Sequence, residues 1–146
     1  QPLGALSTAQ RQAAQAALAD YRRTLLARAD YPETQMQIAG VAMTLRNFDA
    51  AQSALKEALR MDPQLFDAWI TLARIQAALG KRHEAVETLE KSLALAGPSP
   101  ETLEKLALQH LFAGNREEAR EYAEQLRETY PSHRPSPPIR QLLQSD

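Results

Sequence analysis

The stretch LRNFDAAQSALKEALRMDP, Leu45–Pro63, returns twice along the chain with most of its letters changed. Thirty-four residues later Leu79–Gly97 reads LGKRHEAVETLEKSLALAG, and after the same interval Ala113–Pro131 reads AGNREEAREYAEQLRETYP. Self-similarity at a fixed period of this length is typical of proteins built from repeated supersecondary units. We therefore divide the chain into units 32–65, 66–99 and 100–133, with flanking segments 1–31 and 134–146.

Each unit predicts two antiparallel helices joined by a short turn. Pro32 and Pro100 open the first helix of two units, at a position where the missing backbone N–H costs nothing. Apolar residues then follow at helical spacing. The turns fall at Arg46-Asn47, Gly80-Lys81 and Gly114-Asn115, where Gly supplies a left-handed C-cap. Small residues recur where two helices must approach closely, namely Ala39, Ala73, Ala107, Ala51, Ala85 and Ala119.

The residues at these positions resemble the signature of the tetratricopeptide repeat family. The middle unit meets that signature in order with Trp69, Leu72, Ala73, Ala85, Leu89 and Ser92. The departures, which weaken individual packing layers, are Gln35 at a large apolar position and Ala42, Gln76 and His110 at the aromatic position. The resemblance covers residues 32–133 and implies an all-α fold, a right-handed superhelical array of three such helix pairs.

The flanking segments predict one further helix each. Ser7 or Thr8 is a suitable N-cap for a helix running to about Arg28. In register, its Ala17, Tyr21 and Leu25 match Ala51, Leu55 and Leu59, so it looks like the second helix of a unit. After Pro131 a Pro-rich bend leads to a short helix around Ile139–Gln144. We expect Ile139, Leu142 and Leu143 to cover the exposed face of the last unit.

Composition excludes several classes of function. The 146 residues carry a net charge of −1, from 17 basic and 18 acidic side chains, so there is no electrostatic case for binding nucleic acid or an anionic membrane. No apolar run is long enough to insert into a membrane. The absence of Cys excludes disulfides and thiolate chemistry but leaves the compartment open.

We find no motif that carries catalysis or metal binding. The three histidines, His83, His110 and His133, do not have metal-ligand spacing. No Gly-rich phosphate loop, nucleophile elbow or HExxH is present. The sequence therefore predicts no enzyme, no cofactor and no metal. We expect His110 to be a packed, hydrogen-bonded core residue and Trp69 to pack in the core.

The family resemblance implies that the first helices line a concave groove. The residues at its groove-facing positions are Met36, Gly40, Met43, Ile70, Arg74, Ala77, Glu101, Leu108 and Leu111. Apolar side chains are unexpected on a helix face that meets solvent, and contiguous exposed apolar surface usually marks an interaction site. Arg74 lies between Asp67 and Glu101, so it either forms an intramolecular ion pair or anchors a partner's carboxylate.

Two functions fit these observations. One is a protein–protein interaction scaffold whose groove binds a helix or extended peptide of unknown identity. The other is a structural spacer or oligomerisation segment, with the groove filled by the 139–144 tail, a second copy or the parent protein. These alternatives differ in whether Met36, Ile70 and Leu108 are exposed in the isolated chain.

The origin of the chain is open to interpretation. It begins at Gln1 rather than Met, so we interpret it as a segment of a longer protein. The excess of Arg over Lys with abundant Ala suggests a bacterial gene. The opening ALSTAQRQAAQAALADYRR, followed by such repeats, is similar to the C-terminal tail of bacterial multihaem cytochrome proteins. That similarity implies the periplasm, with the haem chemistry outside this segment, and otherwise a cytoplasmic location stays open.

Overall fold

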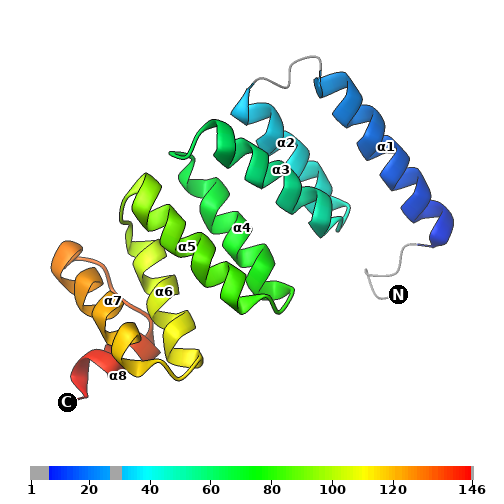
Figure 1. Cartoon of the computed structure of the whole chain (residues 1–146). Helices are drawn as coiled ribbons and strands as arrows, with labels where there is room; N and C mark the ends of the chain where they lie inside the picture. Colours follow the sequence, from blue (N-terminus) through cyan, green and yellow to red (C-terminus); the bar gives the residue numbers. More distant parts are fainter. Residues whose placement is uncertain (1–6, 27–30, 146) are drawn as a thin grey trace. The chain divides into compact units, whose positions relative to one another are not determined.

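The described part of the protein is entirely helical, as predicted. The structure is a computed structural model that describes residues 7–26 and 31–145, apart from the side chains of residues 24–26. Within these ranges the chain forms eight α-helices and no strand (Figure 1). They are α1 (Thr8–Leu26), α2 (Pro32–Thr44), α3 (Phe48–Met61), α4 (Phe66–Ala78), α5 (Arg82–Ala96), α6 (Pro100–Phe112), α7 (Arg116–Thr129) and α8 (Pro137–Gln144).

The helices belong to two compact units, an N-terminal unit Gln1–Asp62 and a C-terminal unit Pro63–Asp146. In the N-terminal unit α2 pairs with α3, and α1 packs against α2. In the C-terminal unit α4 pairs with α5 and α6 with α7, while α5 and α6 join the two pairs. Figure 1 shows the two helices of each pair running in opposite directions. Each unit thus contains the helix pairs that the repeat predicts.

The turns inside the three pairs have the same hydrogen-bonded geometry. Each turn closes with a bond from a backbone N–H to the carbonyl oxygen five residues earlier, as in the Schellman motif. These bonds join Asn47 to Ala42, Lys81 to Gln76 and Asn115 to His110, and each is 2.8 Å long. Gly80 and Gly114 have φ values of 79° and 84°, which confirms the predicted left-handed caps. Arg46 adopts the same conformation, with φ of 56°, at a cost of about 1 kcal/mol because it carries a Cβ.

Side-chain caps begin several helices. The Ser7 hydroxyl accepts a bond of 3.2 Å from the N–H of Gln10, so Ser7 caps α1 as predicted. Asn47 and Ser99 cap α3 and α6 in the same way, with bonds of 3.1 and 3.0 Å. The expected end of α1 at Arg28 and the side chain of Leu25 lie outside the described residues.

The core of the C-terminal unit is formed by apolar residues at helical spacing, as the repeat predicts. Leu103, Leu106 and Leu89 are almost fully buried. Trp69 is also buried, and its indole N–H donates to the carbonyl oxygen of Pro63 at 2.8 Å, which confirms that it packs in the core. Gln76 stands where the family has an aromatic residue. Its carbonyl oxygen accepts a bond of 2.7 Å from the hydroxyl of Thr88, so this buried departure is satisfied.

His110 is packed as predicted, but its hydrogen bond is not formed. Its ring stacks on Tyr122, with centroids 5.5 Å apart. Its Nε2 is buried without a hydrogen-bond partner in the described chain, and the Glu90 carboxylate lies 4.0 Å away. The prediction was wrong because stacking on Tyr122 orients the ring with Nε2 beyond hydrogen-bond range of that carboxylate.

Burial raises the pKa of Tyr122, and Glu90 and Glu121 raise it further.

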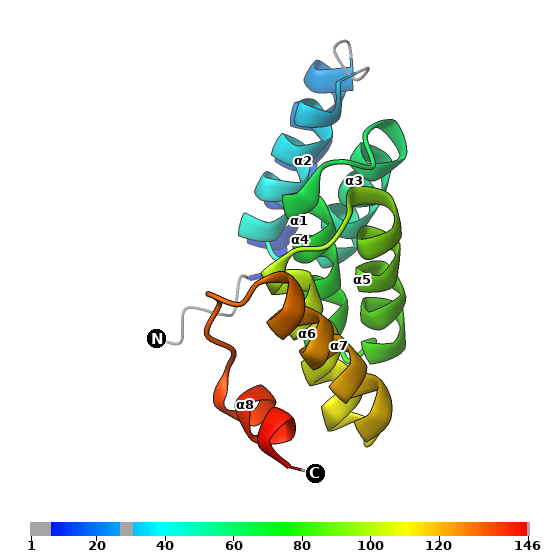
Figure 2. The same cartoon turned by 90° about the vertical axis from the view of Figure 1, so that its left-hand side faces the viewer.

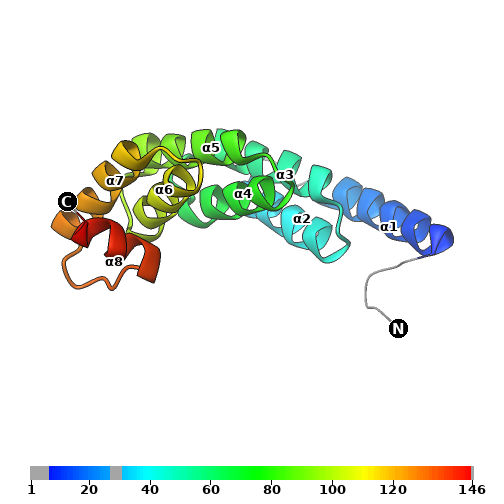
Figure 3. The same ribbon diagram turned by 90° about the horizontal axis from the view of Figure 1, so that it is seen from below.

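The C-terminal helix α8 packs on the last helix pair, as predicted. Ile139 and Leu142 are buried against a cluster that includes Ala107 of α6 and Ala119 of α7, and Leu143 packs at its edge. Figures 2 and 3 both show α8 lying beside α6 and α7. Residues Ile139, Leu142 and Leu143 repeat the stripe of Leu103, Leu106 and Ala107, but at an interval of 36 residues. The linker therefore holds two residues more than the repeat requires.

Candidate protein-binding faces

The N-terminal unit has an open strip on α2, which we call the α2 face: Met36, Gly40 and Met43. Their spacing of four and three residues puts them on one side of the helix. Gly40 is exposed, and a Cβ built on it would meet no atom within 4 Å. Met36 and Met43 are half-buried on either side. An interior helical Gly costs about 1 kcal/mol relative to Ala, so Gly40 destabilises α2. No neighbouring atom in the described structure requires a residue without a side chain at this position.

The C-terminal unit has a second surface, the α4–α6 face, made by the predicted residues Ile70, Arg74 and Ala77 of α4 and Glu101, Leu108 and Leu111 of α6. The prediction was wrong for Ile70, which is only 7% exposed. It belongs to a core cluster with Ala85, Leu89 and Leu106. The cause is packing from two sides, because the cluster includes side chains of α5, the partner of α4 in its own pair, and of α6 in the next pair. Ala77 packs at the edge of the same cluster.

Arg74 is exposed and makes no ion pair with any side chain that the structure describes. Of the two alternatives left open for Arg74, the intramolecular ion pair with Asp67 or Glu101 is therefore not formed among the described side chains. Glu101 instead lies 3.8 Å from the ammonium of Lys105, one turn along its own helix. Because Lys105 is only four residues from Glu101 on the same helix, this ion pair competes with one between Glu101 and Arg74 on another helix. The guanidinium of Arg74 is consequently presented to solvent.

The tail covers one end of the α4–α6 face. Leu108 and Leu111 are half-buried and pack against the cluster that contains Ile139 and Leu142 of α8. Of the occupants considered for the groove, the 139–144 segment therefore contacts this end. The stretch around Arg74 and Ala77 has no such contact with α8 among the described clusters.

A hydrogen-bonded clasp on Glu104 holds the linker that leads to α8. Its Oε2 lies 2.7 Å from Nε2 of His133, and its Oε1 accepts a bond of 2.6 Å from the backbone N–H of Ser136. Burial alone would raise the pKa of Glu104. The hydrogen bonds from His133 and Ser136 outweigh burial and place the pKa below its ordinary value. The clasp therefore depends on an ionised carboxylate.

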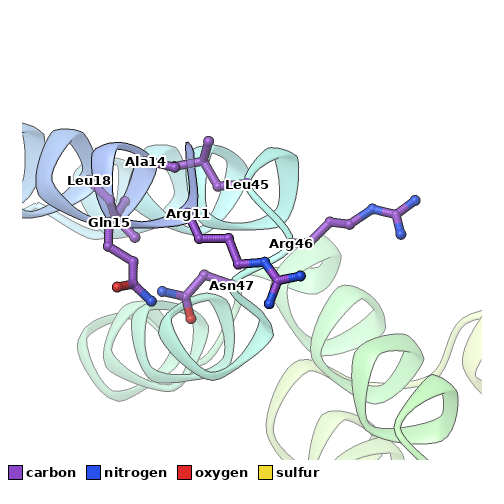
Figure 4. A pocket seen from close by; sticks show the side chains of 7 residues that line it. All are labelled: Arg11, Ala14, Gln15, Leu18, Leu45, Arg46 and Asn47. Atoms are coloured by element: carbon purple, nitrogen blue, oxygen red, sulfur yellow. The ribbon is translucent and has the colours of Figure 1, made fainter. Parts of the chain in front are cut away.

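The N-terminal unit contains a pocket of about 180 Å³ that no sequence pattern predicted, between α1 and the turn that joins α2 to α3. Its lining residues are Arg11, Ala14, Gln15, Leu18, Leu45, Arg46 and Asn47. Figure 4 shows the side chains of Gln15 and Asn47 directed toward each other, while Arg46 points away from them. No sequence signal marks this pocket, because it exists only through the packing of α1 beside the turn.

Two further findings concern metal binding and membrane insertion. Across residues 7–26 and 31–145 no three His, Asp or Glu side chains gather as they would around a metal ion. Each of the described helices is too short or too polar to cross a bilayer.

Antiparallel helix pairs that recur every 34 residues, with matching turns, define an α-helical repeat protein. Family models of the tetratricopeptide repeat match residues 42–107 and 101–133. The chain belongs to the tetratricopeptide repeat family. As a member of that family, it is a protein–protein interaction scaffold in general terms. No significant match is found among curated protein sequences.

Solved structures of similar fold support this assignment. A crystal structure of MamA has a TM-score of 0.64 at 21% identity, and the match covers 83% of this chain and 66% of that one. YrrB has a TM-score of 0.61 at 19% identity, covering 84% of this chain and 63% of that one. A thermophilic TPR protein from Thermus thermophilus has a TM-score of 0.58 at 26% identity, covering 82% and 67%. The chain thus spans about two thirds of the length of these structures.

Proposed function

We propose that the chain binds protein segments, each a helix or an extended peptide, through two separate faces: the α2 face of the N-terminal unit and the uncovered part of the α4–α6 face of the C-terminal unit. The observation that carries this proposal is Gly40. It lies exposed in the middle of α2, between two half-buried methionines, and no described atom occupies the space above it. A partner backbone that approaches α2 closely would explain why a side chain is missing at this point.

The chemistry around Gly40 suits an apolar partner surface. Methionine side chains are flexible and polarisable, so Met36 and Met43 can repack around different side chains. On the α4–α6 face, Arg74 offers a guanidinium to a carboxylate. A segment with apolar anchors is therefore expected at the α2 face, and one with an acidic group at the α4–α6 face.

A similar structure and the family as a whole support the proposal that this chain binds a peptide. YrrB, one of the similar structures, is described as a TPR protein with an unusual peptide-binding site. YrrB is similar to this chain in fold only. Its binding site shows that this architecture can bind a peptide, but it does not indicate which residues of this chain would do so. Tetratricopeptide repeat proteins are generally non-enzymatic scaffolds, which agrees with the expectation that this chain catalyses no reaction.

A peptide library tests the α2 face directly. Peptides selected on the wild-type chain are expected to lose at least tenfold in affinity for Gly40→Leu, because the new side chain fills the space that the partner uses. Ser53→Leu is the matched control, because Ser53 is a small exposed residue on α3, outside the α2 face. The proposal fails if selected peptides bind Gly40→Leu as well as they bind the wild type.

The alternative function, a spacer or oligomerisation segment, is favoured by one observation: α8 covers Leu108 and Leu111. Light-scattering mass across a concentration series separates the two, using the wild type and Met36→Glu. A dimer that Met36→Glu abolishes would assign the α2 face to assembly. Monomers in both cases, with unchanged stability, would leave that face available to a different partner.

A further inference from the structure

The junction between α7 and α8 departs from the repeat at one position of α7. Leu59 and Leu93 share a register near the ends of their second helices. Leu93 packs against the core cluster that contains Leu106 of the first helix that follows it. The third member of this register is Arg127, which is exposed. A leucine-sized apolar side chain is therefore missing where α7 meets α8.

A pocket of about 290 Å³ lies at this place, within the C-terminal unit. Its lining residues come from α7, the linker and α8, and they are Leu126, Arg127, Pro131, His133, Pro135, Arg140, Leu143 and Gln144. The linker, which is two residues longer than the repeat requires, runs from the end of α7 to the start of α8 (Figure 2). The clasp on Glu104 holds this linker through His133 and Ser136, and so it fixes one wall of the pocket.

The walls of the pocket combine apolar surface with two guanidinium groups. Leu126 is buried and Leu143 half-buried, and two prolines add further apolar surface. Arg127 and Arg140 are exposed, and neither forms an ion pair with a side chain in residues 7–26 or 31–145. The described lining residues include no Asp or Glu. Because a guanidinium binds a carboxylate through two parallel N–H···O bonds, these walls suit an apolar group that carries a carboxylate.

We propose that this α7–α8 pocket is a binding site for a small apolar group joined to a carboxylate. Its volume is close to the lower end of the range for ligand pockets, about 300 Å³, so the ligand is small. The last residue of a polypeptide that ends in Leu has this chemistry, and so does a free aliphatic acid. The pocket shares no residue with the α2 face or the α4–α6 face, so the inference goes beyond the function proposed above.

The register of α8 disfavours a second helix as the occupant. At the position where a first helix lets its partner helix approach, α8 has Leu143, whereas the other first helices have Ala39, Ala73 and Ala107. A larger side chain there keeps two helix backbones apart. After α8 the chain is held on the first half of α7, because Arg116 and Arg120 donate hydrogen bonds to Ser145. The pocket lies at the opposite end of α7, and the described part of the tail leaves it open.

A titration followed by nuclear magnetic resonance tests the site, because this method detects weak binding. N-acetyl-Gly-Leu with a free carboxylate is expected to shift the methyl signals of Leu126 and Leu143 until they saturate. Its C-terminal amide is expected to bind at least about tenfold more weakly, because it lacks the charge that the guanidiniums recognise. Equal affinity for the two dipeptides overturns the proposal, and so does the absence of binding by any carboxylate tested.

A third probe, 4-methylpentanoate, identifies the source of the ligand. It has the carboxylate and branched apolar chain but no peptide group. An affinity equal to that of the dipeptide would assign the site to free aliphatic acids. An affinity at least about tenfold lower would assign it to the end of a polypeptide, because the peptide group then adds contacts of its own.

Matched substitutions decide whether the pocket itself is the site. Arg140→Ala is expected to weaken dipeptide binding at least about tenfold, since it removes one of the two guanidiniums. Arg134→Ala is the control, because Arg134 is an exposed arginine of the same linker that does not line the pocket. Arg127→Leu restores the leucine of the repeat and is expected to fill the pocket and abolish binding. Equal affinities of Arg140→Ala and Arg134→Ala overturn the proposal.

Discussion

The end helices α8 and α1 are each packed against other helices, but to different extents. Helix α8 has 8 residues and buries Ile139 and Leu142 on the pair α6 and α7. Helix α1 has 19 residues, yet among the side chains described on it only Leu18 is buried. Among the side chains that the structure describes on these two helices, the shorter helix thus buries more of its large apolar residues.

This difference shows that register matters more than helix length at the ends of a repeat array. The apolar residues of α8 have the spacing of those on a first helix, and α8 packs on the complete pair α6 and α7. Helix α1 has the register of a second helix, and its main contact among the described helices is with α2. In repeat proteins stability comes from contacts between neighbouring helices, so a helix with fewer such contacts is held less firmly.

Replacing the buried leucine of each end helix provides the largest test of this comparison. Leu142→Ala is expected to cost about 3 kcal/mol of unfolding free energy, because it leaves a cavity in a closed cluster. Leu18→Ala is expected to cost about 2 kcal/mol, the lower end of the range for a buried leucine, because Leu18 borders the open pocket and its loss creates no sealed void. Chemical denaturation of the two variants measures both values.

Arg140→Ala is the control for α8, because Arg140 is exposed. Its effect is expected to stay within about 0.5 kcal/mol. Equal losses for Leu142→Ala and Leu18→Ala would show that α1 is held as firmly as α8.

The clasp on Glu104 provides a smaller, pH-dependent test of how α8 is held. The pKa of Glu104 lies below its ordinary value of 4.5 in the folded chain. Ionised Glu104 therefore stabilises the fold fully above pH 4.5, and this contribution is lost as the pH falls through the folded pKa. At neutral pH, Glu104→Gln is expected to cost about 1.5–3 kcal/mol, the usual range for a hydrogen bond to a charged group.

The measurement is unfolding free energy against pH for wild type and Glu104→Gln. The two curves are expected to converge once the pH falls below the pKa of Glu104 in the folded chain, which lies below 4.5, since both side chains are then neutral. Parallel curves at all pH values would show that the clasp does not depend on the ionised carboxylate.

The smallest expected effect concerns the turn of the N-terminal unit. Arg46→Gly is expected to stabilise the chain by about 1 kcal/mol, because Gly adopts positive φ without strain. Gly80→Ala is expected to destabilise the C-terminal unit by a similar amount, since it introduces the same strain where none exists. Thermal unfolding of the two single variants checks both signs, and a change of the same sign in both would contradict this explanation.

The period of 34 residues predicted the helix pairs because each pair is stabilised by its own stripe and turn. The glycines at 80 and 114 and the small residues at the helix crossings required no knowledge of distant contacts. The cover provided by α8 was also predictable, since Ile139, Leu142 and Leu143 are apolar on one side of a short helix.

The candidate faces were less predictable because exposure depends on the neighbouring pair. Ile70 occupies a groove register by family resemblance, but α5 and α6 close over it. Arg74 was expected to find an acid, whereas Glu101 reaches Lys105 within its own helix. The stacking of His110 on Tyr122 likewise depends on how α6 and α7 cross. None of these outcomes is set by local spacing.

The position of Trp69 has a consequence for spectroscopy. It is the single Trp of the chain, it lies in α4, and its buried indole bonds to Pro63 within the C-terminal unit. Tryptophan emission therefore reports on that unit, whereas far-ultraviolet circular dichroism reports on the helices of both. If the two signals change at different denaturant concentrations, the units unfold separately, and a single two-state free energy would describe neither of them.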